Sequence, residues 1–238
     1  AADHRITVGR EIIRMWDGFD PEEYAAQVLA KTPMFQNRNI SVPPAKLGYV
    51  GHFHGVKGIA VGSARRSYLL DHLSLEPLRA CGDLERLVVR GIDGVVDVSV
   101  LPELALTKLA VRSCGAVSPA QVLQHCDALR SLEFSHVAVT GLKWIADMQQ
   151  LETLTLDTAG QWDDLAALRS APKVTTLELN QIAGEPTPEI LPRLNLARLR
   201  ITGEAIPGIP GVVAEMEQLE SLTPVSYTHL TLPTTSRV

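Results

Sequence analysis

The chain has 238 residues, of which 45% are hydrophobic and 21% charged, and its formal net charge is −5 at pH 7. These values are ordinary for a globular protein and exclude the strongly basic balance of a general nucleic-acid or anionic-membrane binder. No apolar run approaches the roughly 20 residues of a membrane span. Cys81, Cys114 and Cys126 fit neither a disulfide framework nor a zinc site, so reduced thiols in a cytoplasmic protein are expected.

Residues 1–50 differ in composition from the rest of the chain and are predicted to form an N-terminal flank or cap. Within them, residues 20–31 (DPEEYAAQVLAK) have the pattern of a helix, with aspartate and proline at its start and two glutamates that favour the helix dipole. Residues 37–48 (NRNISVPPAKLG) contain two adjacent prolines and are predicted to form a loop.

Beyond this flank, the motif LxxLxL recurs at nearly constant spacing. A loose match, VKGIAV, starts at Val56. Seven further copies are separated by 22, 23, 22, 23, 22 and 23 residues, and they start at Leu84, Leu106, Leu129, Leu151, Val174, Leu196 and Leu219. Spacing this regular indicates a structural repeat.

Each copy is predicted to begin one coil of a solenoid. In LRSLEF, Leu132 and Phe134 alternate with polar residues, as in a short strand with one buried face. The period is too short for a full βαβ unit, so strands of successive coils are expected to stack in parallel, with Leu109 beside Leu132 in one buried column. The predicted strands cover residues 86–90, 108–112, 131–135, 153–157, 176–180 and 198–202.

The segments between these strands are predicted to be short helices. In SPAQVLQHC, Ser118 is placed as an N-cap and Pro119 at the first helical position. Residues 140–148 (TGLKWIADM) and 162–170 (WDDLAALRS) carry apolar residues at helical spacing, and TPEILPRL and GVVAEMEQL supply two further turns.

This pattern resembles the leucine-rich repeat family over residues 56–222. The family pattern LxxLxLxxN/C has Asn or Cys at its ninth position, which Cys114 matches. The other units have apolar residues there, so an apolar column is expected in place of an asparagine ladder: Ile92, Val137, Ala159 and Ile182. The resemblance implies an α/β solenoid with a parallel β-sheet on the concave face and short helices on the convex face. Degenerate arrays of this kind resemble those attached to bacterial signalling NTPases.

The seventh copy departs from the pattern at Pro224, because proline cannot donate a ladder hydrogen bond where a strand residue is expected. The following residues, VSYTHLTLPT, resemble one translated frame of the transposase adapter DNA used in sequencing libraries. Residues 224–238 are therefore predicted to be a non-native, adapter-derived tail. The solenoid is predicted to occupy residues 51–223, and the sequence is expected to be a fragment of a larger protein.

Charged residues at the third, fifth and seventh positions of each unit are predicted to project from the concave sheet, where the family binds partners. They form a basic, an acidic and a second basic block: Arg86, Arg90, Lys108 and Arg112; Glu133, Asp157 and Glu178; Arg198 and Arg200. Charge segregated by strand is suited to steering a charged protein partner. A solvated face without a ligand is the alternative.

Motifs for chemistry are sparse. His52 and His54 in GHFHG have no third metal ligand nearby. GVKGIAVGSARR lacks the GxxxxGK[ST] and GxGxxG patterns of phosphate-binding loops. Cys126 follows His125, but no Asp or Asn completes a catalytic set. We therefore expect no metal, no cofactor and no catalytic residue.

Two functions from different classes remain open. The first is a non-catalytic binding or sensor module that recognises a protein partner, not nucleic acid or a membrane, and that is monomeric as a fragment. The second is the repeat region of a multidomain enzyme, such as a signalling NTPase, kinase or ligase, whose catalytic domain lies outside these residues.

Overall fold

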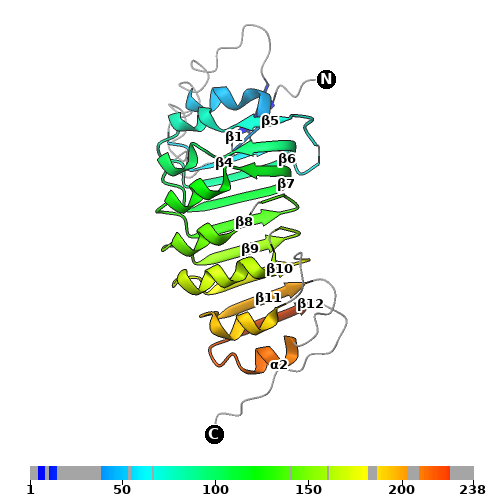
Figure 1. The fold of residues 1–238 in the computed structure, drawn as a ribbon. Helices are drawn as coiled ribbons and strands as arrows, with labels where there is room; N and C mark the ends of the chain where they lie inside the picture. The colour runs from blue at the N-terminus through cyan, green and yellow to red at the C-terminus, as the bar shows by residue number, and fades with distance from the viewer. Residues whose placement is uncertain are drawn as a thin grey trace.

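The computed structural model describes residues 5–8, 11–14, 39–52, 55–65, 67–139, 141–159, 161–181, 187–202 and 209–225. Their strands form one sheet in the order β12-β11-β10-β9-β8-β7-β6-β4-β3-β1-β2, with β5 paired to β6. Successive coils of the chain lie one on the next, and the stack is elongated (Figure 1). The predicted α/β solenoid is confirmed. The helix predicted at 20–31 lies outside the described residues.

The strands of the main stack pair in parallel. They are β3 (Asn39–Val42), β4 (Gly58–Gly62), β6 (Arg86–Asp97), β7 (Lys108–Ser118), β8 (Ser131–Ser135), β9 (Thr153–Asp157), β10 (Thr176–Asn180), β11 (Arg198–Thr202) and β12 (Ser221–Val225). At the N-terminal end, β1 (Arg5–Val8) pairs antiparallel with β3 and with β2 (Glu11–Arg14). All six predicted strands begin at the predicted residue.

The leucines of the fourth position form one buried column through the stack. Leu109 lies directly opposite Leu132, as predicted. Each member is at most 2% exposed: Ile59, Leu87, Leu109, Leu132, Leu154, Leu177 and Leu199. A fully buried residue of this kind is stabilised by burial of its apolar surface, about 1.5–3 kcal/mol per side chain. Because each member packs against those of adjacent coils, the column joins the coils into one core.

The ninth position is also an apolar column, as predicted. Ile92, Cys114, Val137 and Ala159 are buried. Ile182 lies outside the described residues. In these coils, side-chain packing takes the place of the hydrogen-bonded asparagine ladder of the family pattern.

Helical segments line the side of the stack opposite the sheet (Figure 1). They are η2 (Pro44–His52), η3 (Glu76–Ala80), η4 (Leu101–Glu103), η5 (Ala120–His125), η6 (Lys143–Asp147), η7 (Trp162–Ser170), η8 (Pro188–Arg193) and α2 (Ile209–Ala214). Their positions confirm the predicted return segments, but those labelled η are 3-10 helices and only α2 is α-helical among the described residues.

A three-residue spacing of apolar side chains explains the 3-10 geometry. Leu75, Leu78, Cys81 and Leu84 are all buried. The backbone N–H of each of the last three donates to the carbonyl three residues earlier, at 2.8–3.0 Å. A 3-10 helix has three residues per turn, so this spacing directs every apolar residue to the core. The same spacing recurs further along the chain at Leu142, Ile145 and Met148.

Two local predictions are wrong. Ser118 is no N-cap but the last residue of β7, opposite Asp97, because a residue that precedes proline favours extended conformations. Residues 39–42 form β3 instead of a loop, since Ile40 and Val42 alternate with polar residues and are buried against β4. The sheet thus runs across residue 50, and the division of the chain at that residue stays a prediction.

At the other end, β12 includes Pro224, which lies opposite Ile201. The last strand of a sheet tolerates proline because its outer side needs no ladder partner. Residues 226–238 lie outside the described residues, so the adapter-derived tail also stays a prediction.

The coils of β6 and β7 carry a second parallel ladder. After a bulge between Ile92 and Val95, the end of β6 pairs with β5 (His72–Ser74) on one side and with the end of β7 on the other. Gly94 makes this corner possible, because a Cβ there would lie 2.2 Å from the carbonyl oxygens of Leu70 and Asp71. Only glycine permits such a close approach of one coil to the next.

Candidate interaction surface

The candidate surface, here called the sheet face, is the side of the main sheet formed by third, fifth and seventh positions. Strand alternation directs the fourth and sixth positions to the core and leaves this side accessible. All nine predicted charged residues lie on it as exposed or half-buried side chains: Arg86, Arg90, Lys108, Arg112, Glu133, Asp157, Glu178, Arg198 and Arg200.

The register brings the basic residues of β6 and β7 together. Arg86 lies opposite Lys108, and Arg90 lies opposite Arg112. The acidic residues do not form one column, because Glu133 and Glu178 occupy the fifth position and Asp157 the seventh. At the end of the acidic block, Glu178 lies directly opposite Arg200 of the second basic block.

One ion pair joins the first basic block to the acidic block. Arg112 donates from Nε to Oε1 of Glu133 at 2.5 Å and from Nη2 to Oε2 at 2.6 Å. This two-point hydrogen bond raises the pKa of Arg112. The pair neutralises two of the nine charged residues, so the charge available to a partner is concentrated on the strands on either side. Sequence spacing alone gave no indication of this diagonal contact.

A polar row crosses the seventh position of β8, β9 and β10. The carboxylate of Asp157 accepts hydrogen bonds from Ser135 Oγ at 2.9 Å and from Asn180 Nδ2 at 2.7 Å. His136 lies beside it, with Nε2 3.6 Å from Asp157 Oδ2 and Nδ1 2.5 Å from Thr158 Oγ1. The carboxylate therefore cross-links three strands.

The row brings a hydroxyl, an imidazole and a carboxylate together, but its geometry favours a structural role. The hydroxyl of Thr158 donates to the backbone carbonyl of Asp157 at 2.7 Å, and His136 is 57% exposed at its side chain. The backbone N–H of His136 donates to the backbone carbonyl of Asp157 at 2.7 Å. This hydrogen bond joins the turn of one coil to the strand of the next. The row fastens successive turns to each other.

The three cysteines are free, as predicted, and all three are buried. Burial raises the pKa of Cys81 to about 11 and that of Cys126 to about 12, the latter with a smaller contribution from Asp127. A thiol with so high a pKa is a poor nucleophile at neutral pH. Within the described residues, no group of three His, Cys, Asp or Glu side chains could hold a metal ion. His54 lies outside those residues.

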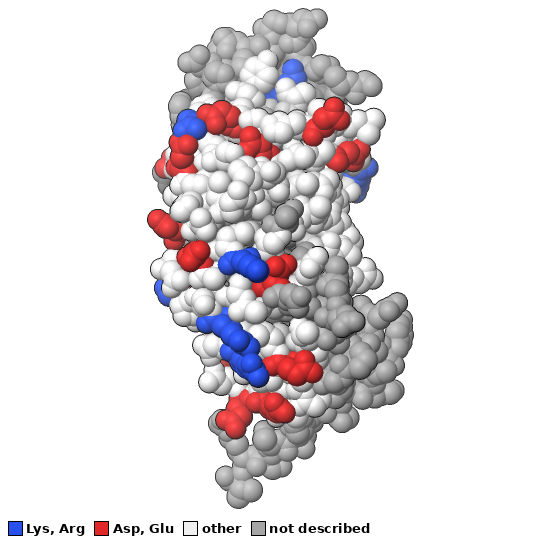
Figure 2. All heavy atoms as spheres, in the orientation of Figure 1, with Lys and Arg blue, Asp and Glu red and all other residues white. Residues whose placement is uncertain are grey.

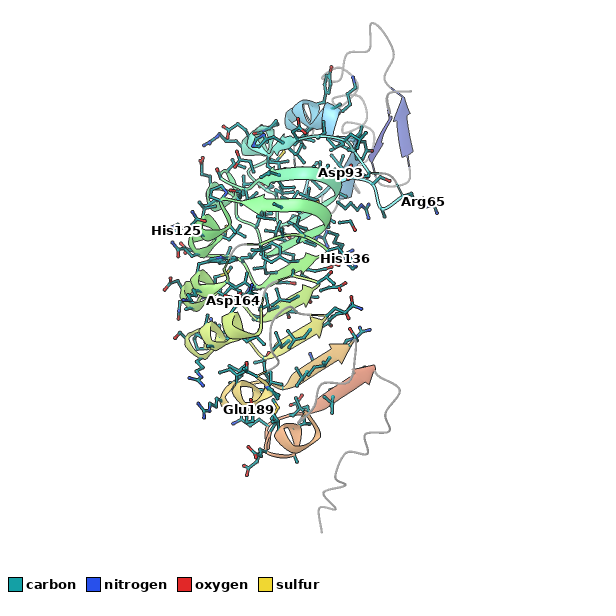
Figure 3. The ribbon with its side chains drawn as sticks, turned by 45° about the vertical axis from the view of Figure 1, so that its right-hand side comes forward. Arg65, Asp93, His125, His136, Asp164 and Glu189 are labelled. Carbon is teal, nitrogen blue, oxygen red and sulfur yellow. The ribbon has the colours of Figure 1, made fainter. Side chains whose placement is uncertain are left out.

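A cavity of about 420 Å³ opens where β4 ends, beside the middle of β6 and β7. We call it the Arg90 pocket; its polar lining includes Ser63, Arg65, Ser67, Arg90, Asp93 and Arg112. Figure 3 shows Arg65 and Asp93 on the edge of the stack away from the helices, and His125, Asp164 and Glu189 on the helical side. Two of the lining residues were predicted from the sequence as part of the sheet face, Arg90 and Arg112.

Gly62 holds one wall of this pocket in place. Its φ is +87°, and a Cβ there would lie 2.0 Å from the carbonyl oxygen of Arg90. Glycine therefore lets the segment after β4 lie directly against β6. No sequence pattern indicated that residues 63–65 and 67 lie beside β6.

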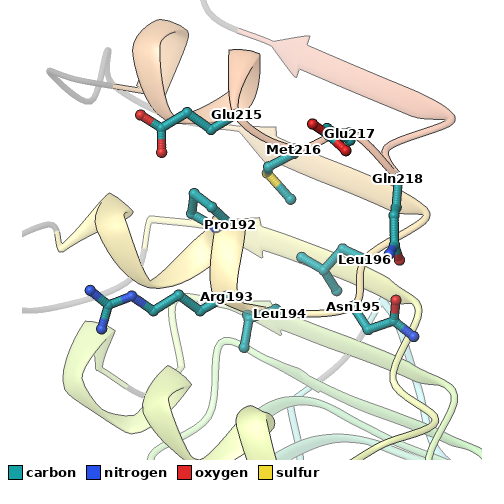
Figure 4. A pocket seen from close by; sticks show the side chains of 9 residues that line it. All are labelled: Pro192, Arg193, Leu194, Asn195, Leu196, Glu215, Met216, Glu217 and Gln218. Carbon is teal, nitrogen blue, oxygen red and sulfur yellow. The ribbon is translucent and has the colours of Figure 1, made fainter.

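A second cavity, of about 350 Å³, lies between η8 and α2 and is lined by residues 192–196 and 215–218 (Figure 4). Its charged side chains do not converge, because the ends of Arg193 and Glu215 lie apart and are directed outward. On the side of the molecule shown in Figure 2, acidic and basic side chains are interspersed among uncharged ones. Neither feature matches the concentration of cations at the Arg90 pocket.

Solved structures place this architecture among known folds. The chain superposes on internalin InlF of Listeria monocytogenes with a TM-score of 0.54 and 18% identity, covering 74% of this chain and 56% of the internalin. A leucine-rich repeat protein of Leptospira interrogans gives a TM-score of 0.54 and 17% identity, with coverages of 78% and 46%. The chain has a leucine-rich repeat fold.

Another leucine-rich repeat structure, internalin C2 of Listeria monocytogenes, matches with a TM-score of 0.52 and 15% identity over 86% of this chain and 92% of the internalin. No protein-family model and no curated protein matches the chain. At these identities the likeness shows the fold alone. No helix among the described residues has the length and apolar character needed to cross a membrane.

Proposed function

We propose that the chain is a non-catalytic interaction module whose sheet face binds a protein partner. The observation that carries this proposal is the grouping of charge by strand on an accessible sheet. Four cations lie together on β6 and β7, and two more lie on β11 beyond the acidic block. Repeat solenoids present extended surfaces of this kind to their partners.

Electrostatic steering is the expected mechanism of recognition. Clustered charges of one sign attract a complementary surface and accelerate encounter, and salt weakens the effect. Arg112 is neutralised by Glu133 and Arg90 is half-buried, so the exposed cations that can steer a partner in the first block are Arg86 and Lys108, which lie opposite each other. If the chain is instead the recognition region of a larger enzyme, the same surface would bind the partner in the same way.

Reduced buried thiols support a reducing, cytoplasmic location as part of this proposal. In the cytoplasm the chain would bind its partner at physiological ionic strength, where the Debye length is about 8 Å. Only charges close to the partner then contribute to the rate of association.

The test compares charge reversal on two sides of the stack. A partner captured from the source organism and identified by cross-linking is bound to the wild type, to Arg86→Glu/Lys108→Glu, and to Lys143→Glu/Arg169→Glu on the helical side. We expect the sheet-face variant to associate at least about tenfold more slowly, with a weaker dependence on salt, while the helical-side variant matches the wild type. The reverse ranking would place the interface on the helices.

A further inference from the structure

We propose that the Arg90 pocket binds an oxyanion, a carboxylate or a phosphate group, carried by a polypeptide partner. The inference that a polypeptide carries the oxyanion rests on the proposed function. The pocket adjoins the sheet face, because Arg90 and Arg112 line the pocket and occupy the seventh position of their strands. Capture of the free anion does not depend on that function. The two ideas can therefore fail separately.

The charge balance of the pocket is positive. Arg65, Arg90 and Arg112 line it, with Asp93 as the one carboxylate among the lining residues. The hydroxyl of Ser67 donates to Asp93, which is thereby already engaged. Glu133 takes up Nε and Nη2 of Arg112, which leaves Nη1 available. The charges of Arg65 and Arg90 have no acidic partner among the described residues, so an anion would complete the pocket.

Arg90 gives the most direct indication of a missing ligand. Among the described residues, the Nε of Arg90 is the one buried side-chain nitrogen or oxygen atom that has no hydrogen-bond partner. Buried polar groups in folded proteins nearly always have a partner, and a buried nitrogen on a charged group is especially unfavourable without one. Negative charge in the cavity that Arg90 lines would offset this cost.

Further donors converge on the same cavity. Ser63 Oγ accepts the backbone N–H of Arg65 at 3.1 Å, which leaves its own hydroxyl proton free to donate. Guanidinium groups and hydroxyls are the donors that proteins use for carboxylate and phosphate oxygens. The set therefore matches an oxyanion in both charge and hydrogen-bonding capacity.

The size and position of the pocket favour a polypeptide source. A volume of about 420 Å³ exceeds that of a lone oxyanion, since a water molecule occupies roughly 30 Å³. The surplus can hold part of the residue that carries the anion. Leu69, 90% exposed and two residues after Ser67, offers an apolar contact for the adjoining chain.

The experiment is an NMR titration of the intact chain with sodium phosphate and, separately, sodium acetate at constant ionic strength. The Arg side-chain Nε–H signals are followed, and the Arg90 signal is identified by its absence in Arg90→Lys. We expect saturable movement of the Arg90 signal. Binding should be at least tenfold weaker in Arg65→Met, measured by the Arg90 signal, and in Arg90→Met, measured by the signal of Arg112, which also lines the pocket. Arg65 is exposed, so its substitution keeps the test valid if Arg90→Met fails to fold.

Arg169→Met is the matched control, because Arg169 is exposed on η7 of the helical side, loses the same charge, and lies neither in the pocket nor on the sheet face. It should bind like the wild type. If phosphate saturates the Arg90 signal at a lower concentration than acetate, the natural ligand group is a phosphorylated residue. If acetate does so, the ligand group is an acidic side chain or a chain terminus. An unmoved Arg90 signal with both anions, or equal weakening in Arg169→Met and Arg90→Met, would overturn the proposal. A partner that still binds the sheet face would then leave the proposed function intact.

Discussion

In β6 and β7 the chain keeps strand geometry for 12 and 11 residues, whereas in β8, β9, β10 and β11 it does so for five. Both regions begin each coil with the same leucine pattern and share the same buried column. They differ at the corner after the strand. The long strands pass a bulge and continue into a second ladder, while the short ones turn at once.

The corner residues show the reason for this difference. In the long-strand region, Gly94 has no Cβ and lets one coil lie against the next. A left-handed turn occurs in both regions: Ser113 of β7 has a φ of 50°, and His136, Thr158 and Gln181 of the short-strand region have φ of 48–50°. This conformation is unfavourable for residues with a side chain. The left-handed turn is therefore shared, and close contact between coils through a missing side chain is what distinguishes the long-strand region.

Removal of one leucine from the shared column should have the largest effect. Leu87→Ala in the long-strand region and Leu154→Ala in the short-strand region are each expected to lower the free energy of unfolding by about 2–5 kcal/mol. Urea unfolding followed by circular dichroism measures this loss. Thr155→Ala, half-buried beside Leu154, is the control and should change it by no more than about 1 kcal/mol. A loss in only one region would show that the column is not shared.

Substitutions at the two kinds of corner should have opposite signs. Gly94→Ala forces a Cβ against backbone oxygens and is expected to cost about 1–3 kcal/mol. Gln181→Gly relieves a left-handed φ of 48° but adds freedom to the unfolded chain, so a gain of up to about 1 kcal/mol is expected. Thermal melts of both variants provide the comparison, and destabilisation by both would contradict it.

Buried thiols allow the two regions to be compared by pH. Cys81 precedes β6, the first long strand, and Cys126 occupies the equivalent position before β8, the first strand of the short-strand region; burial favours the neutral forms of both thiols. Above their ordinary value of 9.0, the unfolded thiols ionise while the folded ones, with pKa values of about 11 and about 12, stay protonated. Stability should therefore fall as pH rises above 9, by at most about 1.4 kcal/mol per unit for each thiol.

Cys81→Ala and Cys126→Ala should each flatten this dependence when urea unfolding at pH 8.5 and 10.5 is compared with the wild type. Ionisation of lysines and tyrosines is common to all three proteins and cancels. An unchanged slope in either variant would show that its thiol is accessible to water in the folded state.

Truncation after Val225 should have the smallest effect. The residues removed follow no repeat pattern, and Leu222, which lies opposite Leu199, is retained. The free energy of unfolding is expected to change by no more than about 0.5 kcal/mol. Cooperative loss of folding would mean that residues 226–238 belong to the native protein and that their resemblance to adapter DNA is accidental.

The main strands and their register could be predicted from the sequence because leucine spacing alone fixes them. Leu109 and Leu132 had to be neighbours once each coil was 22 or 23 residues long. The 3-10 helices were missed, although the spacing of Leu75, Leu78 and Cys81 contained the signal. Three-residue and 3.6-residue periods differ little over a single turn, and only the hydrogen bonds separate them.

The candidate surface was predictable only in part. Strand alternation placed Arg86 and Lys108 on the sheet face without knowledge of any contact. The pairing of Arg112 with Glu133 depends on a diagonal between strands, and the Arg90 pocket depends on residues 63–65 and 67 lying beside β6. Contacts of this kind arise from the approach of separate segments, which no local pattern encodes.

The three-residue spacing on the helical side limits where coil length can change during evolution. One inserted residue between Leu75 and Leu84 would turn an apolar side chain out of the core, and one inserted within a strand would exchange its buried and exposed faces. The turns at the strand ends lie between these two periodic stretches and can lengthen without disturbing either. The Arg90 pocket opens at that edge, so insertions and deletions in relatives should collect where ligand specificity can diverge while the core is preserved.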